Sequence, residues 1–123
     1  MTKHNTYLLL GEAKAASSEE LFVAEWATSS IFDPDPDAPD PDYEEIVRYL
    51  RDIWTAAHVT IREVRQHTGL TQEEFSKAYA IPRRTLQNWE RTDGTEARSC
   101  PPYLVLLLAQ VTGLVDVLEA PHA

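Results

Sequence analysis

The chain has 123 residues, of which 43% are hydrophobic and 25% are charged, and this composition is typical of one globular domain with an appended element. Its longest apolar run, residues 103–109, is far shorter than the roughly 20 residues of a membrane-spanning helix, and residues 1–10 are too weakly apolar for a secretory signal. The single cysteine, Cys100, excludes an intrachain disulfide and fits a reducing compartment, so we expect a cytoplasmic protein with no membrane partner.

Residues 1–31 are predicted to form an N-terminal helical extension, and residues 32–42 an acidic linker. In the extension, Ser17 and Glu20 have the spacing of a capping box at the start of a helix. The linker alternates aspartate with proline, which lacks an amide donor and forces its neighbours toward extended geometry. We therefore expect a stiff spacer, which would span about 30 Å if about ten residues adopt polyproline geometry.

Residues 43–119 are predicted to form a helical domain, because apolar residues recur at three- and four-residue spacing. Its helices are expected over residues 43–58, 61–67, 72–79, 82–91 and about 102–111. Thr60 is expected to cap the second of these helices and Gly69 to end it in a left-handed conformation. Thr71 and Glu74 form a further capping box. Every expected element is helical, so the predicted fold class is all-α.

The segment 71–91 has the pattern of a helix-turn-helix, whose second helix enters the major groove of DNA. Phe75, Leu86 and Trp89 are spaced to form the core that the two helices share. The other face of the second helix carries types of side chain that read base edges, because arginine pairs with guanine and glutamine or asparagine with adenine. The expected base-reading residues are Arg83, Arg84, Gln87 and Asn88, and the expected contacts to the DNA backbone are Gln72, Arg91 and Arg98. The alternative is that these polar residues only solvate an exposed helix face.

Four strings within residues 61–90 resemble the Xre/Cro family of lambda-repressor-like DNA-binding domains: residues 61–65, 69–75, 81–86 and 89–90. The resemblance covers residues 60–113 and implies a repressor that binds a palindromic operator as a homodimer. It also implies an ion pair between Arg65 and Glu90 that ties the first helix of the domain to the recognition helix. The version of the motif found here is similar to that of antitoxins and mobile-element regulators. The chain departs from the family at Ala80, where a glycine is usual, and in a longer loop over residues 92–98.

The last predicted helix is apolar around most of its circumference. Such a helix is too apolar for a solvated surface, so two interpretations remain. Either it lies wholly in the core, or it packs on the core with one side and on a second subunit with the other. The second interpretation agrees with the homodimer that the resemblance implies.

The charge is unevenly distributed along the chain, whose formal net charge is −9. Residues 1–59 contain four basic and twelve acidic residues, whereas residues 60–123 contain seven and eight. The acidic half gives an alternative function, in which it mimics nucleic acid toward a basic toxin or host protein and the helix-turn-helix is a scaffold. Double-stranded DNA remains the expected partner. No sequence pattern of a catalytic centre, metal site or cofactor site is present, so we expect no enzyme and no cofactor.

Overall fold

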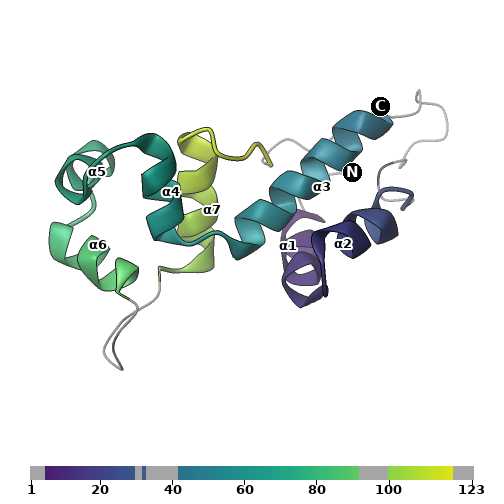
Figure 1. The fold of residues 1–123 in the computed structure, drawn as a ribbon, viewed down its shortest axis with the longest axis horizontal. Coiled ribbons are helices and arrows are strands. Elements are labelled where there is room, and N and C mark those ends of the chain that lie inside the picture. Colours follow the sequence, from purple (N-terminus) through teal and green to yellow (C-terminus); the bar gives the residue numbers. More distant parts are fainter. Residues whose placement is uncertain (1–4, 30–31, 33–41, 92–99, 118–123) are drawn as a thin grey trace. The chain divides into compact units, whose positions relative to one another are not determined.

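The computed structural model describes residues 5–29, 32, 42–91 and 100–117, and over these residues the chain is helical without strands (Figure 1). The predicted all-α class is therefore confirmed for the described residues. The helices are α1 (Asn5–Ala15), α2 (Glu19–Trp26), α3 (Tyr43–His58), α4 (Ile61–Thr68), α5 (Gln72–Tyr79), α6 (Arg83–Glu90) and α7 (Pro102–Val111).

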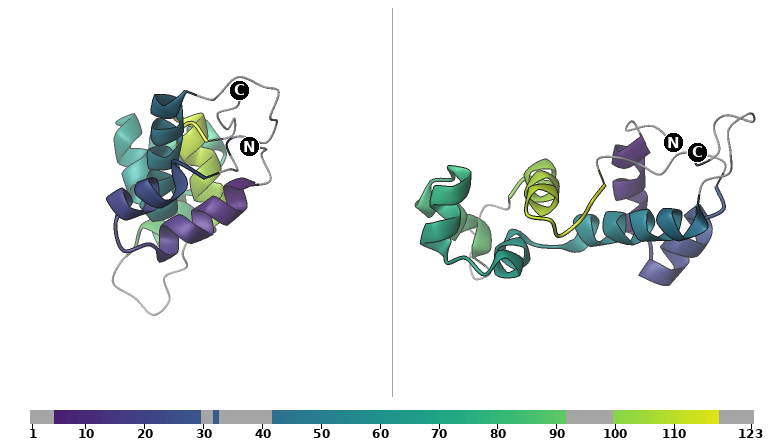
Figure 2. Two further views of the ribbon diagram at one scale, coloured as in Figure 1. Left: turned by 90° about the vertical axis from the view of Figure 1, so that its right-hand side faces the viewer. Right: turned by 90° about the horizontal axis from the view of Figure 1, so that it is seen from above.

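The chain divides into two compact units. The acidic unit comprises residues 1–58 and 115–123, and the α4–α7 unit comprises residues 59–114. Residues 43–58 are predicted to belong to the helix-turn-helix domain, whereas in the structure α3 packs with α1 and α2 (Figures 1 and 2). Packing of α3 against the helix-turn-helix or against α1 and α2 would require the same amphipathic pattern. That pattern shows which face of the helix is buried, but it does not show which neighbour covers the face.

The core of the acidic unit lies between α3 and the two helices that precede it. The fully buried side chains at its centre are Leu9, Phe22, Tyr49, Leu50 and Ile53. Phe32 is buried as well, with its ring edge-on to Tyr49 at a centroid distance of 6.2 Å. The linker predicted from residue 32 therefore begins too early, because an aromatic side chain stabilises the fold most when it is removed from water. Of the predicted linker, residues 33–41 lie outside the described residues.

The start of α2 differs by one residue from the prediction. Ser18, and not Ser17, caps the helix, and its hydroxyl accepts a hydrogen bond from the backbone N–H of Leu21 at 3.2 Å. The predicted capping box of Ser17 and Glu20 is therefore wrong. The reason lies in the preceding helix, because the N–H of Ala16 still bonds to the carbonyl of Glu12, and Ser18 is the extended residue directly before α2.

The chain returns to the acidic unit after α7. Val115 and Val117 are buried there, and the backbone N–H of Asp116 donates to the Asp52 carboxylate at 3.0 Å. Arg48 binds the same carboxylate at 3.0 Å and also donates to the carbonyl of Asp116 at 3.5 Å, so α3 holds the returning segment through side chains one helical turn apart. The α4–α7 unit is thus an insertion between two parts of the acidic unit.

The first two helices of the α4–α7 unit begin and end at the residues expected to cap them. Thr60 and Thr71 each form a complete capping box, with Glu63 and Glu74 respectively. Gly69 ends α4 at a φ of 75°, in the left-handed region. These three cap predictions are confirmed. The predicted bounds of α6 are each one residue too wide, because Pro82 precedes the first helical residue and Arg91 is already extended.

Ala80 adopts the left-handed conformation at the turn between α5 and α6, with a φ of 55°. A Cβ atom there crowds the backbone, so we expect Ala80→Gly to stabilise the unit by about 0.5–1 kcal/mol despite the added freedom of the unfolded chain. Ala78→Gly is the matched control, since Ala78 is an exposed residue within α5 and this change should cost about 1 kcal/mol. Urea denaturation of the two variants measures both effects, and equal destabilisation at the two positions would contradict the strain at Ala80.

Candidate functional site

The α5–α6 pair presents one side of α6 to solvent. Phe75 and Leu86 are fully buried between the helices, and Ser76 is small and buried, which lets the helices approach closely. Trp89 was expected in this core but is only partly buried. On the opposite side of α6, Arg83, Arg84 and Gln87 are exposed and Asn88 is partly buried. The structure therefore brings the four expected base-reading residues onto one short helix, with three of them open to solvent.

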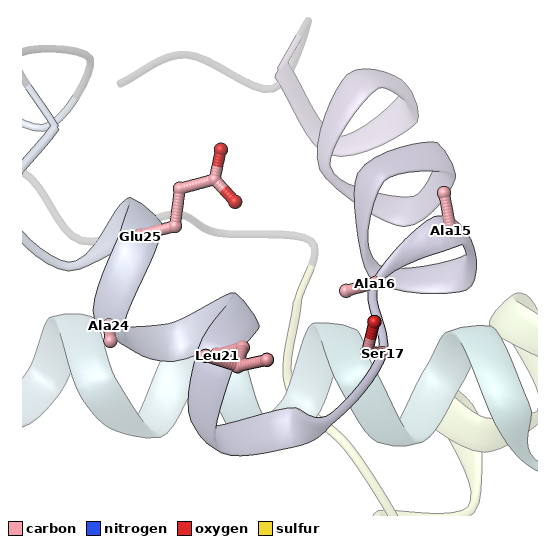
Figure 3. A pocket seen from close by; sticks show the side chains of 6 residues that line it. All are labelled: Ala15, Ala16, Ser17, Leu21, Ala24 and Glu25. Carbon is pink, nitrogen blue, oxygen red and sulfur yellow. The ribbon is translucent and has the colours of Figure 1, made fainter.

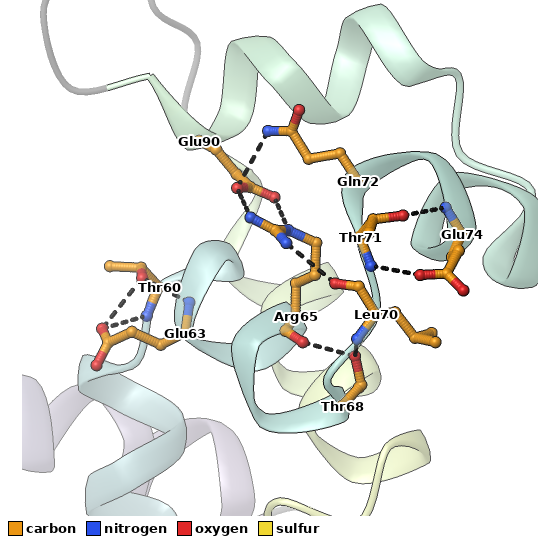
Figure 4. A network of polar contacts seen from close by, with 9 residues as sticks. All are labelled: Thr60, Glu63, Arg65, Thr68, Leu70, Thr71, Gln72, Glu74 and Glu90. Atoms are coloured by element: carbon orange, nitrogen blue, oxygen red, sulfur yellow. Dashed lines mark hydrogen bonds and ion pairs between the residues drawn. The ribbon is translucent and has the colours of Figure 1, made fainter.

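An ion pair between Arg65 on α4 and Glu90 on α6 lies beneath this helix (Figure 4). Arg65 donates from Nε to Glu90 Oε2 and from Nη2 to Glu90 Oε1, both at 2.7 Å, in a bidentate arrangement. Only 16% of the Arg65 side chain and 4% of the Glu90 side chain are exposed. The third guanidinium nitrogen donates to the carbonyl of Leu70 at 3.0 Å. The pair whose presence the family resemblance implies thus fixes the end of α6 to α4 and to the turn before α5.

The two charges of this pair stabilise each other. Burial alone would raise the pKa of the Glu90 carboxyl, but hydrogen bonds from Arg65 and Gln72 and the positive charges of Arg65 and Arg62 hold that pKa below its usual value. The hydrogen bond to Glu90 raises the pKa of Arg65 in turn. The carboxylate is therefore ionised over the whole neutral range, and Arg65 neutralises it locally.

The three residues expected to contact the DNA backbone differ in what the structure shows of them. The side chain of Gln72 points to Glu90 and donates to its Oε1 at 3.3 Å, so the amide is engaged in the ion-pair network (Figure 4). Its backbone N–H stands at the start of α5. Arg91 is exposed directly after α6. Arg98 lies outside the described residues.

The division into units sharpens the charge asymmetry of the sequence. The acidic unit contains four basic and fourteen acidic residues, whereas the α4–α7 unit contains seven and six. Among the described residues, neither Arg83 nor Arg84 has an ion-pair partner. The positive charge of α6 therefore belongs to a unit that is not itself net negative.

Arg62 was not among the residues that the sequence suggested for the site. Arg62 lines a pocket of about 330 Å³ together with Arg65, Gln72, Gln87, Glu90 and Arg91. The signal was available in the sequence, because Arg62 and Arg65 are three residues apart and residues at that spacing lie on the same side of a helix.

A second pocket, of about 550 Å³, lies in the acidic unit between the end of α1 and α2 (Figure 3). Its lining is mostly small and apolar, and Glu25 is its one ionisable residue.

Cys100, in the α4–α7 unit, is buried, and burial raises the pKa of its thiol to about 11, so the nucleophilic thiolate is scarce at neutral pH. Within the described ranges, no three His, Cys, Asp or Glu residues are grouped as a metal site would require.

Comparison of the chain with protein-family models, with curated proteins and with solved structures found no match. The resemblance to the Xre/Cro family therefore rests on the quoted residues alone. Among the described helices, none combines the length and apolar character needed to cross a lipid bilayer.

Proposed function

We propose that this protein is a sequence-specific DNA-binding transcriptional regulator of the repressor type, with α6 as its recognition helix. The observation that carries the proposal is the exposed row of Arg83, Arg84 and Gln87 on a helix that the buried Leu86 and, at its last residue, the Glu90 ion pair fix in place. A recognition helix must be held rigidly, because base readout depends on side chains placed within hydrogen-bonding distance of particular base edges. The proposal includes no catalytic step and no cofactor.

In this proposal Arg83 and Arg84 bind guanine edges and Gln87 and Asn88 bind adenine. Arginine donates two parallel hydrogen bonds to O6 and N7 of guanine, an arrangement that no other base offers in the major groove. The backbone N–H of Gln72 and the side chains of Arg91 and Arg98 set the orientation of the unit through phosphate contacts. The sequence resemblance favours two regulator types, the antitoxin of a toxin–antitoxin locus and the regulator of a mobile element.

The proposal also includes a homodimer, in which two recognition helices enter successive major grooves about 34 Å apart. Three large apolar side chains of α7 support it, because Tyr103, Leu107 and Val111 are 65%, 44% and 67% exposed. They are four residues apart and so share one side of the helix. α7 has no charged residue, so two copies can approach along it without the repulsion that a net charge of −9 creates elsewhere.

A second candidate function is binding of a basic protein, such as a toxin, through the acidic unit. The specific observation in its favour is the excess of fourteen acidic over four basic residues in that unit. Glu44 and Glu45 contribute to it from the exposed start of α3. A surface of this kind raises the rate at which a basic partner associates. An antitoxin can combine the two functions. A measurement of DNA binding distinguishes them, because only the first function requires affinity for duplex DNA.

Selection of bound duplexes from a random pool tests the DNA-binding proposal, and a palindromic consensus is the expected result. On that consensus we expect Arg84→Ala to weaken binding about tenfold or more, because a bidentate base contact contributes about 1–3 kcal/mol of discrimination. Binding of random-sequence duplex should weaken less. The affinities are measured by fluorescence anisotropy at constant salt.

Lys77→Ala is the control for this experiment, since Lys77 is an exposed cation of α5 that pairs with Glu73 at 3.4 Å. It should leave the preference for the consensus unchanged. Equal losses on consensus and random duplex in Arg84→Ala would show that Arg84 does not read bases. No enriched sequence and no duplex affinity at low salt would refute the proposed function and leave the acidic unit as the functional part.

A further inference from the structure

The pocket lined by Arg62 brings together residues from three helices of the α4–α7 unit. Arg62 and Arg65 come from α4, Gln72 from the first turn of α5, and Gln87 and Glu90 from α6, with Arg91 directly after it. Its volume of about 330 Å³ is sufficient for one phosphate group with its remaining water. All six lining side chains are polar, whereas pockets for organic ligands are lined mainly by apolar side chains.

The charge of this pocket is positive. Three guanidinium groups face one carboxylate, and that carboxylate already accepts two hydrogen bonds from Arg65 and one from Gln72. Arg62 is exposed and has no ion-pair partner among the described residues. Its positive charge helps to lower the pKa of Glu90, and its exposed guanidinium remains accessible to an anion from solution. The helix dipole adds little positive charge at the N-terminus of α5, because Glu73 and Glu74 occupy its first turn.

We propose that this pocket binds one phosphate group of the DNA backbone and that Arg62 is the main contact. The planar fork of a guanidinium matches two oxygens of a phosphate, and the exposed Arg62 offers this chemistry. Gln87 belongs both to this pocket and to the exposed row on α6. A phosphate bound here therefore lies beside the base-reading residues and fixes how α6 enters the groove. The inference rests on the proposed function and adds a residue to its binding surface.

The test uses the full chain and a fluorescent random-sequence duplex over a series of salt concentrations. Arg62→Gln is expected to weaken binding roughly tenfold at low salt, and to reduce the slope of log K against log salt by about 0.9, because one phosphate contact fewer releases one counterion fewer. Lys77→Gln is the matched control. It removes the same charge from the same unit outside the pocket, and it should leave the slope unchanged.

A second measurement separates this inference from the proposed function. In ¹⁵N NMR spectra, titration with inorganic phosphate should shift the side-chain amide signals of Gln72 and Gln87 to saturation, and Arg62→Gln should abolish these shifts. A wild-type chain that binds duplex while Arg62→Gln keeps the full slope overturns the phosphate pocket and leaves the DNA-binding proposal standing. A wild-type chain that binds no duplex at low salt overturns the function, and with it this pocket's role on DNA. Phosphate shifts that persist in Arg62→Gln overturn the assignment of Arg62.

Discussion

Replacing Arg65 with alanine is expected to destabilise the α4–α7 unit by about 3 kcal/mol. The change leaves the Glu90 carboxylate buried, with 4% of its side chain exposed, without its bidentate partner. Removing one member of a buried ion pair is costly because the remaining charge keeps its desolvation penalty and loses the attraction that offset it. The carbonyl of Leu70 also loses its guanidinium donor.

Two variants control this prediction, and urea denaturation followed by circular dichroism measures all of them. Arg62→Ala removes an exposed arginine from the same helix and should change the free energy of unfolding by less than about 0.5 kcal/mol. The double variant Arg65→Met with Glu90→Met removes both charges and should recover most of the loss, because no unpaired buried charge remains. Equal destabilisation by Arg65→Ala and Arg62→Ala would show that the pair contributes nothing.

The same pair predicts how stability depends on pH. The pKa of Glu90 is lower in the folded chain than its usual value, so its contribution is fully present above the unfolded pKa of about 4.3 and is lost as the pH falls through the folded value. The α4–α7 unit should therefore lose stability on acidification below about pH 4.5. In the double methionine variant, the part of this acid dependence that comes from Glu90 should be absent.

The sequence was most informative where structure depends on contacts within a few residues. Thr60, Gly69 and Thr71 were placed correctly because a cap is a bond between a side chain or amide and a backbone group at most a few positions away. Even there, a choice between adjacent serines failed, because Ser17 and Ser18 are chemically alike and the length of α1 decides between them. The exposed side of α6 was also predicted correctly, because helical periodicity places it away from the apolar Leu86, which is buried.

Contacts between distant segments could not be predicted from spacing. Phe32 packs edge-on against Tyr49, and the backbone N–H of Asp116 donates to Asp52 of α3, which precedes it by 64 residues. The pocket around Arg62 has the same origin, since its members come from three helices and only their fold brings them together. The Arg65–Glu90 pair was expected only through a family resemblance, which supplied the long-range information that the spacing itself lacks.

The acidic unit and the α4–α7 unit differ in charge in a way that suits separate roles. When the C-terminal segment is counted with α1 to α3, the entire net negative charge belongs to the acidic unit. Phosphate contacts act within a Debye length of about 8–10 Å, so a local positive surface can bind DNA on a chain that is negative as a whole. If the proposed function holds, the acidic unit is expected to weaken non-specific binding, because its negative charge repels the DNA backbone.

Val117→Asp is expected to destabilise the acidic unit by about 4 kcal/mol while leaving the α4–α7 unit folded. Val117 is fully buried, so the new carboxyl loses its water without gaining a partner, and the packing of two methyl groups is lost as well. Val117→Ala removes the methyl groups alone and should cost about 2 kcal/mol in the same unit. The difference between the two variants isolates the cost of the polar group.

The three tryptophans of the chain allow the two units to be followed separately. Trp26 and Trp54 lie in the acidic unit and Trp89 in the α4–α7 unit, so fluorotryptophan labelling gives ¹⁹F NMR signals from each. In Val117→Asp the signals of Trp26 and Trp54 should lose their native positions at lower urea than in the wild type, while Trp89 keeps its midpoint. A shift of Trp54 and Trp89 together, with Trp26 unchanged, would instead support a single domain over residues 43–119 that includes the C-terminal segment. The insertion of one unit between two parts of the other predicts the opposite result, because the fold of the acidic unit needs residues from both sides of the insertion.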